Sequence, residues 1–478
     1  MYSGTVKICH SHITFLDGGS NMNYHIEEDA IGPVKVPDNV LWGPQTQRSH
    51  ENFKIGGRMP YPIIQAILHI KKAAALTNAK LGEISQKKAN LIVKTVDELL
   101  SGKYYDQFPL VIYQTGSGTQ TNMNVNEVIS HLAAKIDPGL PLLPNDDINH
   151  SQSSNDTFPT AMNIAAYVET MKLLPILKHV KKTFDTKSET YKDVIKIGRT
   201  HLQDATPMTV GQEISGWASG IQHNIDYLEV NLPTLLELPI GGTAVGTGLN
   251  TAPHYDTEVV KELGKLYDVS FITAPNKFQG MAEHSGLNMV HSVLKTLSAD
   301  LVKVGNDIRF LASGPRAGYG EFNIPANEPG SSIMPGKVNP TQIEALTMVA
   351  ATVFGHDATI NFAASQGNFE MNVYKPVIIS TYLDSVTLLR ESIKSWDAKL
   401  VAGLTVNPKR MKSLVDQSLM TVTALSPHIG YESAAQIAQK AQKEGTTLRE
   451  AAISSQKISA SDFDKWLIPA NMTHPRTK

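Results

Sequence analysis

Residues 287–311 read LNMVHSVLKTLSADLVKVGNDIRFL, and this stretch decides the fold. Its apolar residues alternate spacings of three and four without a break, which places them on one face of a helix. They are Leu287, Val290, Leu294, Leu297, Leu301, Val304, Ile308 and Leu311. At 1.5 Å per residue such a helix is roughly 37 Å long. The Ser313-Gly314-Pro315 segment that follows is a stop signal, so we expect the helix to end there.

Similar periodic patterns recur elsewhere in the chain. Residues 210–228 repeat the same spacing, and further helical patterns follow Pro340 and cover residues 377–393. Several long helices with apolar stripes predict a mainly α fold with a central long-helix bundle. Each stripe could simply line the core of its own subunit, but so many of them favour association between copies of the chain.

The remaining sequence predicts two flanking domains. Residues 1–150 form an expected N-terminal domain, mixed but mostly helical, and residues 151–407 carry the long helices. After Asn407-Pro408 the stripes shorten, so residues 408–478 form an expected small C-terminal helical domain. A length of 478 residues agrees with several domains.

Within the N-terminal part, residues 62–100 and 124–134 show helical patterns. Residues 22–60 are punctuated by Gly, Pro and Asn, which predicts irregular structure with a strand or two.

Composition excludes several classes of function. The chain has 43 Lys and Arg against 45 Asp and Glu, so no basic field would attract nucleic acid or an anionic membrane, and neither is an expected partner. The single cysteine, Cys9, excludes internal disulfides and thiolate-rich metal sites. Residues 1–21 lack the pattern of a signal peptide or organelle presequence, and no apolar run has transmembrane length. We therefore expect a cytoplasmic protein, or one of the mitochondrial matrix if the source is eukaryotic.

The segment 330–344, GSSIMPGKVNPTQIE, carries the most chemistry. It places two hydroxyls, a cation, an amide and a carboxylate on a Gly- and Pro-rich loop that leads into a helix. Asn339 suits the N-cap of that helix, Pro340 its first position, and Gln342 a capping box. Lys337 and the free backbone N–H groups favour a bound anion.

This loop is not a nucleotide-binding P-loop. Five residues separate Gly330 from Gly336 where a P-loop has four, and Val338 replaces the hydroxyl residue that would bind magnesium. The wider segment 313–340 holds ten Gly or Pro residues in 28 positions. Long irregular segments of this kind are usually functional or mobile, although an ordinary connection between helices is the alternative.

Three further segments, 114–124, 151–157 and 198–204, are rich in hydroxyl and amide side chains. Such groups can hold a dicarboxylate by many hydrogen bonds, although any one segment could be only a turn or helix cap. His201 in the third segment can transfer protons at neutral pH, and Glu344 is the candidate to orient it. Taken alone, either residue would be an ordinary surface side chain.

Together these segments resemble the class II fumarase (fumarate hydratase) family of the fumarase/aspartase superfamily. The matching stretches are GSSIMPGKVNP (330–340), QTGSGTQTNMNVNE (114–127), SQSSNDTFPT (151–160), GRTHLQDATP (198–207), GGTAVGTGLN (241–250) and LSPHIGY (425–431). The resemblance extends from about residue 39 to about residue 467. Three details favour fumarases over aspartases: Gly336 before Lys337, Thr341-Gln342 after the loop, and His201 where aspartases look to carry glutamine.

The resemblance implies a three-domain, mainly helical subunit that forms a homotetramer, with each active site assembled from three chains. It implies reversible anti addition of water to fumarate to give (S)-malate, a reaction of the tricarboxylic acid cycle. Ser331 would remove the C3 proton, while His201 and Glu344 would handle the water. The substrate, a small dicarboxylate, would be held by Ser117, Gly118, Thr119, Ser153, Ser154, Asn155, Thr200, Ser332, Lys337, Val338 and Asn339. The family needs no metal and no organic cofactor, and none is expected here.

The chain departs from the family pattern at one place. Many members carry His-Pro-Asn-Asp as a second, non-catalytic anion site, whereas this chain reads Leu143-Pro144-Asn145-Asp146. A leucine can neither donate a hydrogen bond nor carry charge, so we expect the second site to be weak or absent.

Two other functions stay open from the sequence. The nearer one is an aspartate ammonia-lyase of the same superfamily. The other is a non-catalytic structural protein on the same scaffold, against which the intact Ser331, His201, Lys337 and Glu344 argue.

Overall fold

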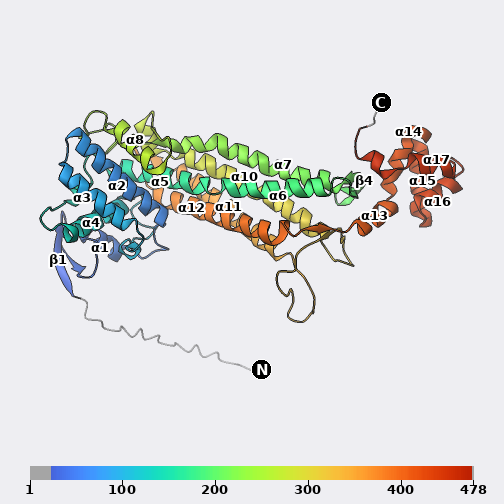
Figure 1. Ribbon diagram of the computed structural model, residues 1–478, viewed down its shortest axis with the longest axis horizontal. Helices are drawn as coiled ribbons and strands as arrows, with labels where there is room; N and C mark the ends of the chain where they lie inside the picture. Colours follow the sequence, from blue (N-terminus) through green and yellow to red (C-terminus); the bar gives the residue numbers. More distant parts are fainter. Residues whose placement is uncertain (1–22, 476–478) are drawn as a thin grey trace, which may run out of the picture.

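The computed structural model describes residues 23–475. Figure 1 shows an elongated molecule, with the N-terminal helices at one end, a long bundle in the middle and a small group of helices at the other end. The expectations for Cys9 and for residues 1–21 lie outside the described residues. Within residues 23–475, no helix is both long and apolar enough to cross a membrane.

The N-terminal region combines one hairpin with four helices. Its elements are β1 (Tyr24–Asp29), β2 (Gly32–Pro37), α1 (Pro44–Asn52), α2 (Tyr61–Leu81), α3 (Gln86–Leu99) and α4 (Thr119–Ile136). Strands β1 and β2 are antiparallel, with Tyr24 opposite Pro37. The helices and strands predicted there are confirmed, but α1 was not predicted, because its sequence PQTQRSHEN has no apolar stripe.

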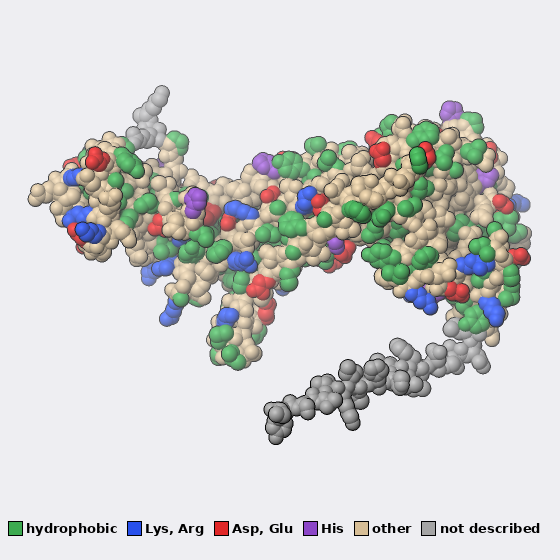
Figure 2. Space-filling view, turned by 180° about the vertical axis from the view of Figure 1, so that it is seen from behind, with side chains coloured by type: hydrophobic (Ala, Val, Ile, Leu, Met, Phe, Trp, Pro, Cys, Tyr) green, Lys and Arg blue, Asp and Glu red, His purple; other side chains and the backbone are tan. Residues whose placement is uncertain are grey.

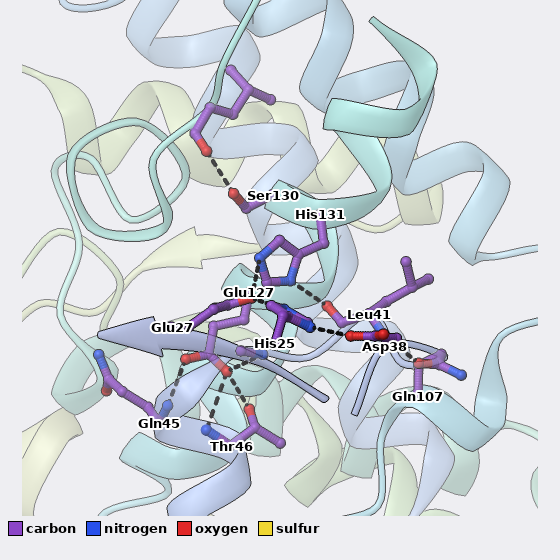
Figure 3. Close-up of polar contacts among 12 residues, drawn as sticks. His25, Glu27, Asp38, Leu41, Gln45, Thr46, Gln107, Glu127, Ser130 and His131 are labelled. Atoms are coloured by element: carbon purple, nitrogen blue, oxygen red, sulfur yellow. Dashed lines mark hydrogen bonds and ion pairs between the residues drawn. The ribbon is translucent and has the colours of Figure 1, made fainter. Parts of the chain in front are cut away.

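Helix α1 is held by a carboxylate from α4 (Figure 3). The Glu127 carboxylate accepts hydrogen bonds from the backbone N–H groups of Gly43 (2.9 Å), Gln45 (2.9 Å) and Thr46 (3.1 Å). A negative charge at a helix N-terminus satisfies donors that have no partner within the helix. Burial nevertheless raises the pKa of Glu127. A long-range contact therefore defines α1, not its own sequence.

The central region consists of long helices joined by short strand pairs. Its elements are α5 (Ser154–Met171), α6 (Leu174–Thr190), β3 (Ile195–Thr200), β4 (Gln203–Thr209), α7 (Val210–Asn231), β5 (Glu237–Leu238), α8 (Tyr255–Tyr267), β6 (Ile272–Thr273), α9 (Lys277–Ala282), α10 (Ser285–Leu311), β7 (Phe322–Asn323), α11 (Thr341–Ala364), β8 (Gly367–Asn368), β9 (Met371–Asn372), α12 (Lys375–Trp396) and β10 (Thr405–Val406). All eight residues of the predicted stripe on α10 are buried, where α10 packs against α7 and α11. The expected mainly α fold with a long-helix bundle is confirmed.

The outer faces of the bundle remain partly apolar. Met289 and Phe310 on α10, and Met348 and Phe362 on α11, are between 46% and 66% exposed. Figure 2 shows hydrophobic side chains spread along this part of the molecule. Large exposed apolar side chains along long helices are typical of surfaces that another chain covers.

The C-terminal helices form a hydrophobic cluster of their own. They are α13 (Pro408–Gln417), α14 (Ser426–Ile429), α15 (Tyr431–Glu444), α16 (Leu448–Ser454) and α17 (Ala460–Trp466). Val422, Ile437 and Phe463 belong to this cluster. The main hydrophobic core is a separate cluster, whose members lie between Leu41 and Met411 in the sequence. The division into domains at residues 150 and 407 stays a prediction.

Candidate functional site

Three hydroxyls meet at the start of two helices. The Ser117 and Thr119 hydroxyl oxygens are 2.8 Å apart, and those of Thr119 and Ser154 are 2.7 Å apart. Thr119 is the first residue of α4 and Ser154 the first of α5. Both helices therefore direct the positive ends of their dipoles at this hydroxyl cluster, which can bind an anion. We refer to Ser117, Thr119 and Ser154 as the hydroxyl cluster.

The backbone around the hydroxyl cluster requires glycine at two positions. Gly118 has φ +79°, and a Cβ atom there would lie 2.2 Å from the Phe158 ring. A Cβ atom on Gly116 would lie 1.5 Å from the Val373 carbonyl oxygen. The tight packing brings the start of α4 against α5 and the segment before α12, so that the hydroxyls can meet.

Two other predicted substrate-binding residues have structural roles in this single chain. The Ser153 side chain caps α5 in a capping box with Asp156. Asn155 donates a hydrogen bond from Nδ2 to the Ala244 carbonyl oxygen at 2.7 Å. Both lie beside the hydroxyl cluster, and the Asn155 amide has further hydrogen-bonding capacity for a ligand.

His201 lies at the tip of the β3–β4 hairpin. Thr200 pairs with Gln203, and the two residues between them, His201 and Leu202, have φ of +56° and +60°. This left-handed conformation is costly for residues other than glycine, and such strain gathers at functional sites. Both side chains are exposed, and they line an open cleft of about 890 Å³ between the hairpin, α7 and α10.

Ser331 lies on the loop between α10 and α11. The Gly330 N–H donates to the Lys337 carbonyl at 2.9 Å, and Asn339 Nδ2 donates to the Gly330 carbonyl at 2.7 Å, which closes the neck of the loop. The segment projects from the bundle in Figures 1 and 2. Ser332, Lys337 and Val338 are exposed on it.

The Ser331 hydroxyl oxygen is held by the backbone. It accepts hydrogen bonds from the N–H groups of Ile333 (3.2 Å) and Met334 (3.0 Å). Hydrogen bonds to the charged form of a group favour that form, so these two donors stabilise a deprotonated serine oxygen.

The predicted cap of α11 is wrong. The helix begins at Thr341 with Pro340 as its N-cap residue, and no side chain caps it. The Asn339 amide bonds the Gly330 carbonyl across the loop instead, and Gln342 accepts a hydrogen bond from Ser395 on α12. The Asn339 side chain cannot both close the loop and cap α11, and in this structure it closes the loop.

The base of this loop is joined to the His201 hairpin. Arg199 on β3 forms an ion pair with the fully buried Glu321, and its guanidinium lies 4.4 Å from the centre of the Tyr319 ring. Lys196 on the same strand pairs with Glu213 on α7 at 2.8 Å. Two cations and two carboxylates thus hold the hairpin and the start of the loop in one rigid unit.

One chain does not bring all the predicted residues together. The hydroxyl cluster and the hairpin lie toward opposite ends of the bundle in Figure 1. Helix α7, with 22 residues, spans about 33 Å of this separation. Among the described residues, the His201 and Glu344 side chains form no hydrogen bond or ion pair with each other, and both are exposed. Their pairing stays a prediction.

Two buried residues whose hydrogen bonds lead to the helices of the hydroxyl cluster were not predicted from the sequence. Lys71 on α2 donates hydrogen bonds to Asn149 and Gln152, and Asp156 accepts the backbone N–H groups of Ser153, Gly241 and Thr243. The spacing of Ser153 and Asp156 is a capping-box signal that could have identified the aspartate. No local signal distinguishes Lys71 from its neighbour Lys72.

Within residues 23–475, no group of three or more His, Cys, Asp or Glu side chains is arranged to hold a metal ion. The site as described consists of hydroxyls, amides, one imidazole and one exposed ammonium.

Comparison with known proteins gives a consistent result. The chain matches the Lyase family over residues 32–355 and the Fumarase C C-terminus family over residues 422–474. It is 52% identical to a class II fumarate hydratase of Helicobacter pylori and 50% identical to that of Bacillus subtilis, over 95% of this chain and the full length of each relative. The crystal structure of class II fumarase from Schistosoma mansoni superimposes with a TM-score of 0.93 at 43% identity, and covers 95% of this chain and all of that one.

The segment of the second anion site supports a test. Leu143 is 51% exposed, and its backbone N–H already donates to the Asp147 carboxylate at 2.8 Å. We expect crystals soaked in a dicarboxylate to show no bound anion at residues 143–146, because the leucine supplies no donor. A Leu143→His variant soaked in the same way is the control, and an anion bound to the parent chain would contradict the prediction.

Proposed function

Because this chain belongs to the class II fumarate hydratase family, we propose that its separated polar segments form one active site shared between subunits. The protein is a lyase of the hydro-lyase type, a fumarate hydratase that interconverts fumarate and (S)-malate. The roles of individual residues, the assembly and the location in the cell are our proposals. The observation that carries the residue assignments is the pair of backbone N–H groups on the Ser331 oxygen.

Ser331 acts as the base that removes the C3 proton of malate. A serine hydroxyl is a weak base unless its alkoxide is stabilised. The Ile333 and Met334 N–H groups are fixed toward this oxygen before any substrate binds, so they lower the cost of forming the alkoxide without reorganisation. The loop that carries Ser331 projects from its own subunit and can reach a neighbouring one.

Removal of the C3 proton places negative charge on the adjacent carboxylate of the substrate. Lys337 on the same loop, together with Asn339 and loop N–H groups, stabilises this aci-carboxylate. Asn339 uses one amide hydrogen to close the loop and retains the other for the substrate.

His201 handles the proton of the water that leaves or attacks on the opposite face. In the hydration direction the neutral imidazole accepts a proton from the attacking water. Glu344 at the start of α11 orients the ring from another subunit, since no such contact forms within one chain.

The hydroxyl cluster holds one carboxylate of the substrate. Further contacts come from residues beside it and from the other two segments, namely Gly118, Ser153, Asn155, Thr200, Ser332 and Val338. Many hydrogen bonds from neutral groups fix the orientation of the dicarboxylate relative to the base and the acid.

The assembly is a homotetramer in which each active site draws on three chains. Two observations support this: the polar segments are separated along the bundle, and the outer faces of α10 and α11 expose large apolar side chains. By its reaction the enzyme serves the tricarboxylic acid cycle. We infer a cytoplasmic location, or the mitochondrial matrix for a eukaryotic source.

The first prediction separates hydration from deamination. We expect the protein to form fumarate from malate and not from aspartate, because His201 provides a proton-transfer group for water. The formation of fumarate is followed by its ultraviolet absorbance, and molar mass is measured on the same sample by light scattering. Fumarate formed from aspartate alone would establish an ammonia-lyase instead, and an active monomer would contradict the shared site.

The second prediction concerns the base. Ser331→Ala should lower kcat by about a thousandfold or more, because it removes the group that takes the proton. The molar mass should be unchanged, since the loop lies outside the core. Ser332→Ala is the matched control, with a smaller loss expected, and wild-type turnover by Ser331→Ala would exclude this serine as the base.

The third prediction concerns the imidazole. His201→Asn should depress kcat/KM for hydration and remove the acid limb of the pH–rate profile, because asparagine does not titrate. Asparagine also tolerates the left-handed backbone conformation at this position, so the hairpin should be retained. A profile identical in shape to that of the wild type would assign the proton transfer to another group.

A further inference from the structure

Lys71 is a fully buried lysine that the proposed mechanism leaves unused. It lies on α2 with no exposed surface, and its ammonium donates hydrogen bonds to Asn149 Oδ1 at 3.0 Å and Gln152 Oε1 at 2.9 Å. Both partners are neutral amides. An ammonium buried without an ion-pair partner is costly, so its retention calls for a reason.

The hydrogen bonds of Lys71 lead to both helices of the hydroxyl cluster. Asn149 Oδ1 also accepts hydrogen bonds from Asn122 at 3.0 Å and Asn126 at 3.1 Å, both on α4. Gln152 directly precedes the segment that caps and begins α5. The ammonium is therefore connected through Asn149 to α4 and through Gln152 to the residue that caps α5.

Lys71 and one buried carboxylate are the charged groups to weigh in this network. The hydroxyl cluster itself contains no cation, whereas the substrate carries two negative charges. The carboxylate that acts on Lys71 is the fully buried Asp156 on α5, whose oxygens accept hydrogen bonds from the backbone N–H groups of Ser153, Gly241 and Thr243. From α8, the buried Tyr255 hydroxyl faces the same aspartate.

Other charged groups near this network have partners of their own. His150, next to Asn149, lies 3.4 Å from Glu83, and Lys277 on α9, which also acts on Asp156, lies 3.6 Å from Asp256. Asp147, two residues before Asn149, binds Lys88 on α3 at 2.6 Å. Burial lowers the pKa of Lys71 to about 7 and raises the pKa of Asp156 to about 6. Protonation of Lys71 therefore changes around neutral pH.

We propose that Lys71 is a positioning residue whose buried ammonium attracts the substrate carboxylate to the hydroxyl cluster without touching it. This inference rests on the proposed function. The charge acts through Asn149, Gln152 and the two helix N-termini, in an interior where electrostatic interactions are weakly screened.

The proposal has a defined dependence on pH. Because burial lowers the pKa of Lys71 to about 7, its positive charge and the affinity for the dicarboxylate should both decrease as the pH rises through the neutral range. The substrate stays a dianion throughout, since carboxylic acids of this type titrate near pH 4. Binding of the dianion in turn favours the ammonium, so binding above neutral pH takes up protons.

The kinetic test uses the intact assembled enzyme with fumarate between pH 6 and 9. For Lys71→Gln we expect a KM about tenfold higher than that of the wild type at pH 6, and a kcat within about twofold of the wild-type value. The increase in KM that the wild type shows above neutral pH should be absent in this variant. Lys71→Arg should keep a low KM over the whole range, because guanidinium does not lose its proton. Lys187→Gln is the matched control, because Lys187 also donates to a neutral group, the Leu404 carbonyl oxygen. Within the part of the chain that the structure describes, Lys187 has no hydrogen bond to the network around the hydroxyl cluster, so KM should not change.

A second measurement can overturn the proposal with the wild type alone and therefore does not depend on the folding of a variant. Succinate, an unreactive four-carbon dicarboxylate, is bound to the wild-type enzyme and to Lys71→Gln at pH 7.5 in buffers of different ionisation enthalpy, and calorimetry gives the number of protons taken up. Net proton uptake by the wild type that Lys71→Gln lacks supports the proposal. No uptake by the wild type, or equal uptake by both proteins, overturns it. An unchanged KM in Lys71→Gln, or a loss confined to kcat, overturns it as well.

These outcomes are distinct from failure of the proposed function. A wild-type protein without fumarate hydration would refute the function itself. An active wild type whose KM for fumarate has the same pH dependence as that of Lys71→Gln would refute only the role of Lys71.

Discussion

The rigidity of the helix bundle is the constraint on which the rest of the structure depends. Helices α7 and α10 are packed along their whole apolar stripes, so the bundle cannot bend to bring its ends together. The hydroxyl cluster and the His201 hairpin are held toward opposite ends of it. A site that uses both must take them from different copies of the chain. In the proposed shared site, assembly is therefore required for catalysis, and the exposed apolar faces of α10 and α11 are the proposed contact surface.

Each polar segment is shaped by packing that its own sequence would not favour. The His201 turn keeps two residues in the left-handed conformation, and the start of α4 is compressed against Phe158 where only Gly118 fits. Such conformations cost free energy locally and persist because the surrounding elements over-determine them. The ion pair of Arg199 with Glu321 has this role at the hairpin, since it joins β3 to the base of the projecting loop.

The proposed site uses two lysines in different ways, one buried and one exposed on the loop. A charge that stabilises substrate, product and transition state alike improves KM without raising turnover, and this is the role proposed for Lys71. The proposed site meets the bound carboxylate directly with neutral hydroxyls and helix N-termini. In this proposal the only direct cationic contact is with Lys337 on the loop, at the carboxylate on which negative charge develops during the reaction.

The sequence by itself determined the long helices α7, α10, α11 and α12, because their periodicity is local. It also identified the residue types proposed to carry the chemistry, since hydroxyls, an imidazole and an ammonium stand in short segments. Only the tertiary structure decided what each group contacts. Helix α1 exists because Glu127, more than 80 positions away, binds its N-terminus, and Asn339 closes a loop rather than capping a helix. Lys71 and Lys72 are adjacent and chemically identical, yet one is buried and the other pairs with Asp97 near the surface. Burial depends on contacts between distant segments, which no local pattern records.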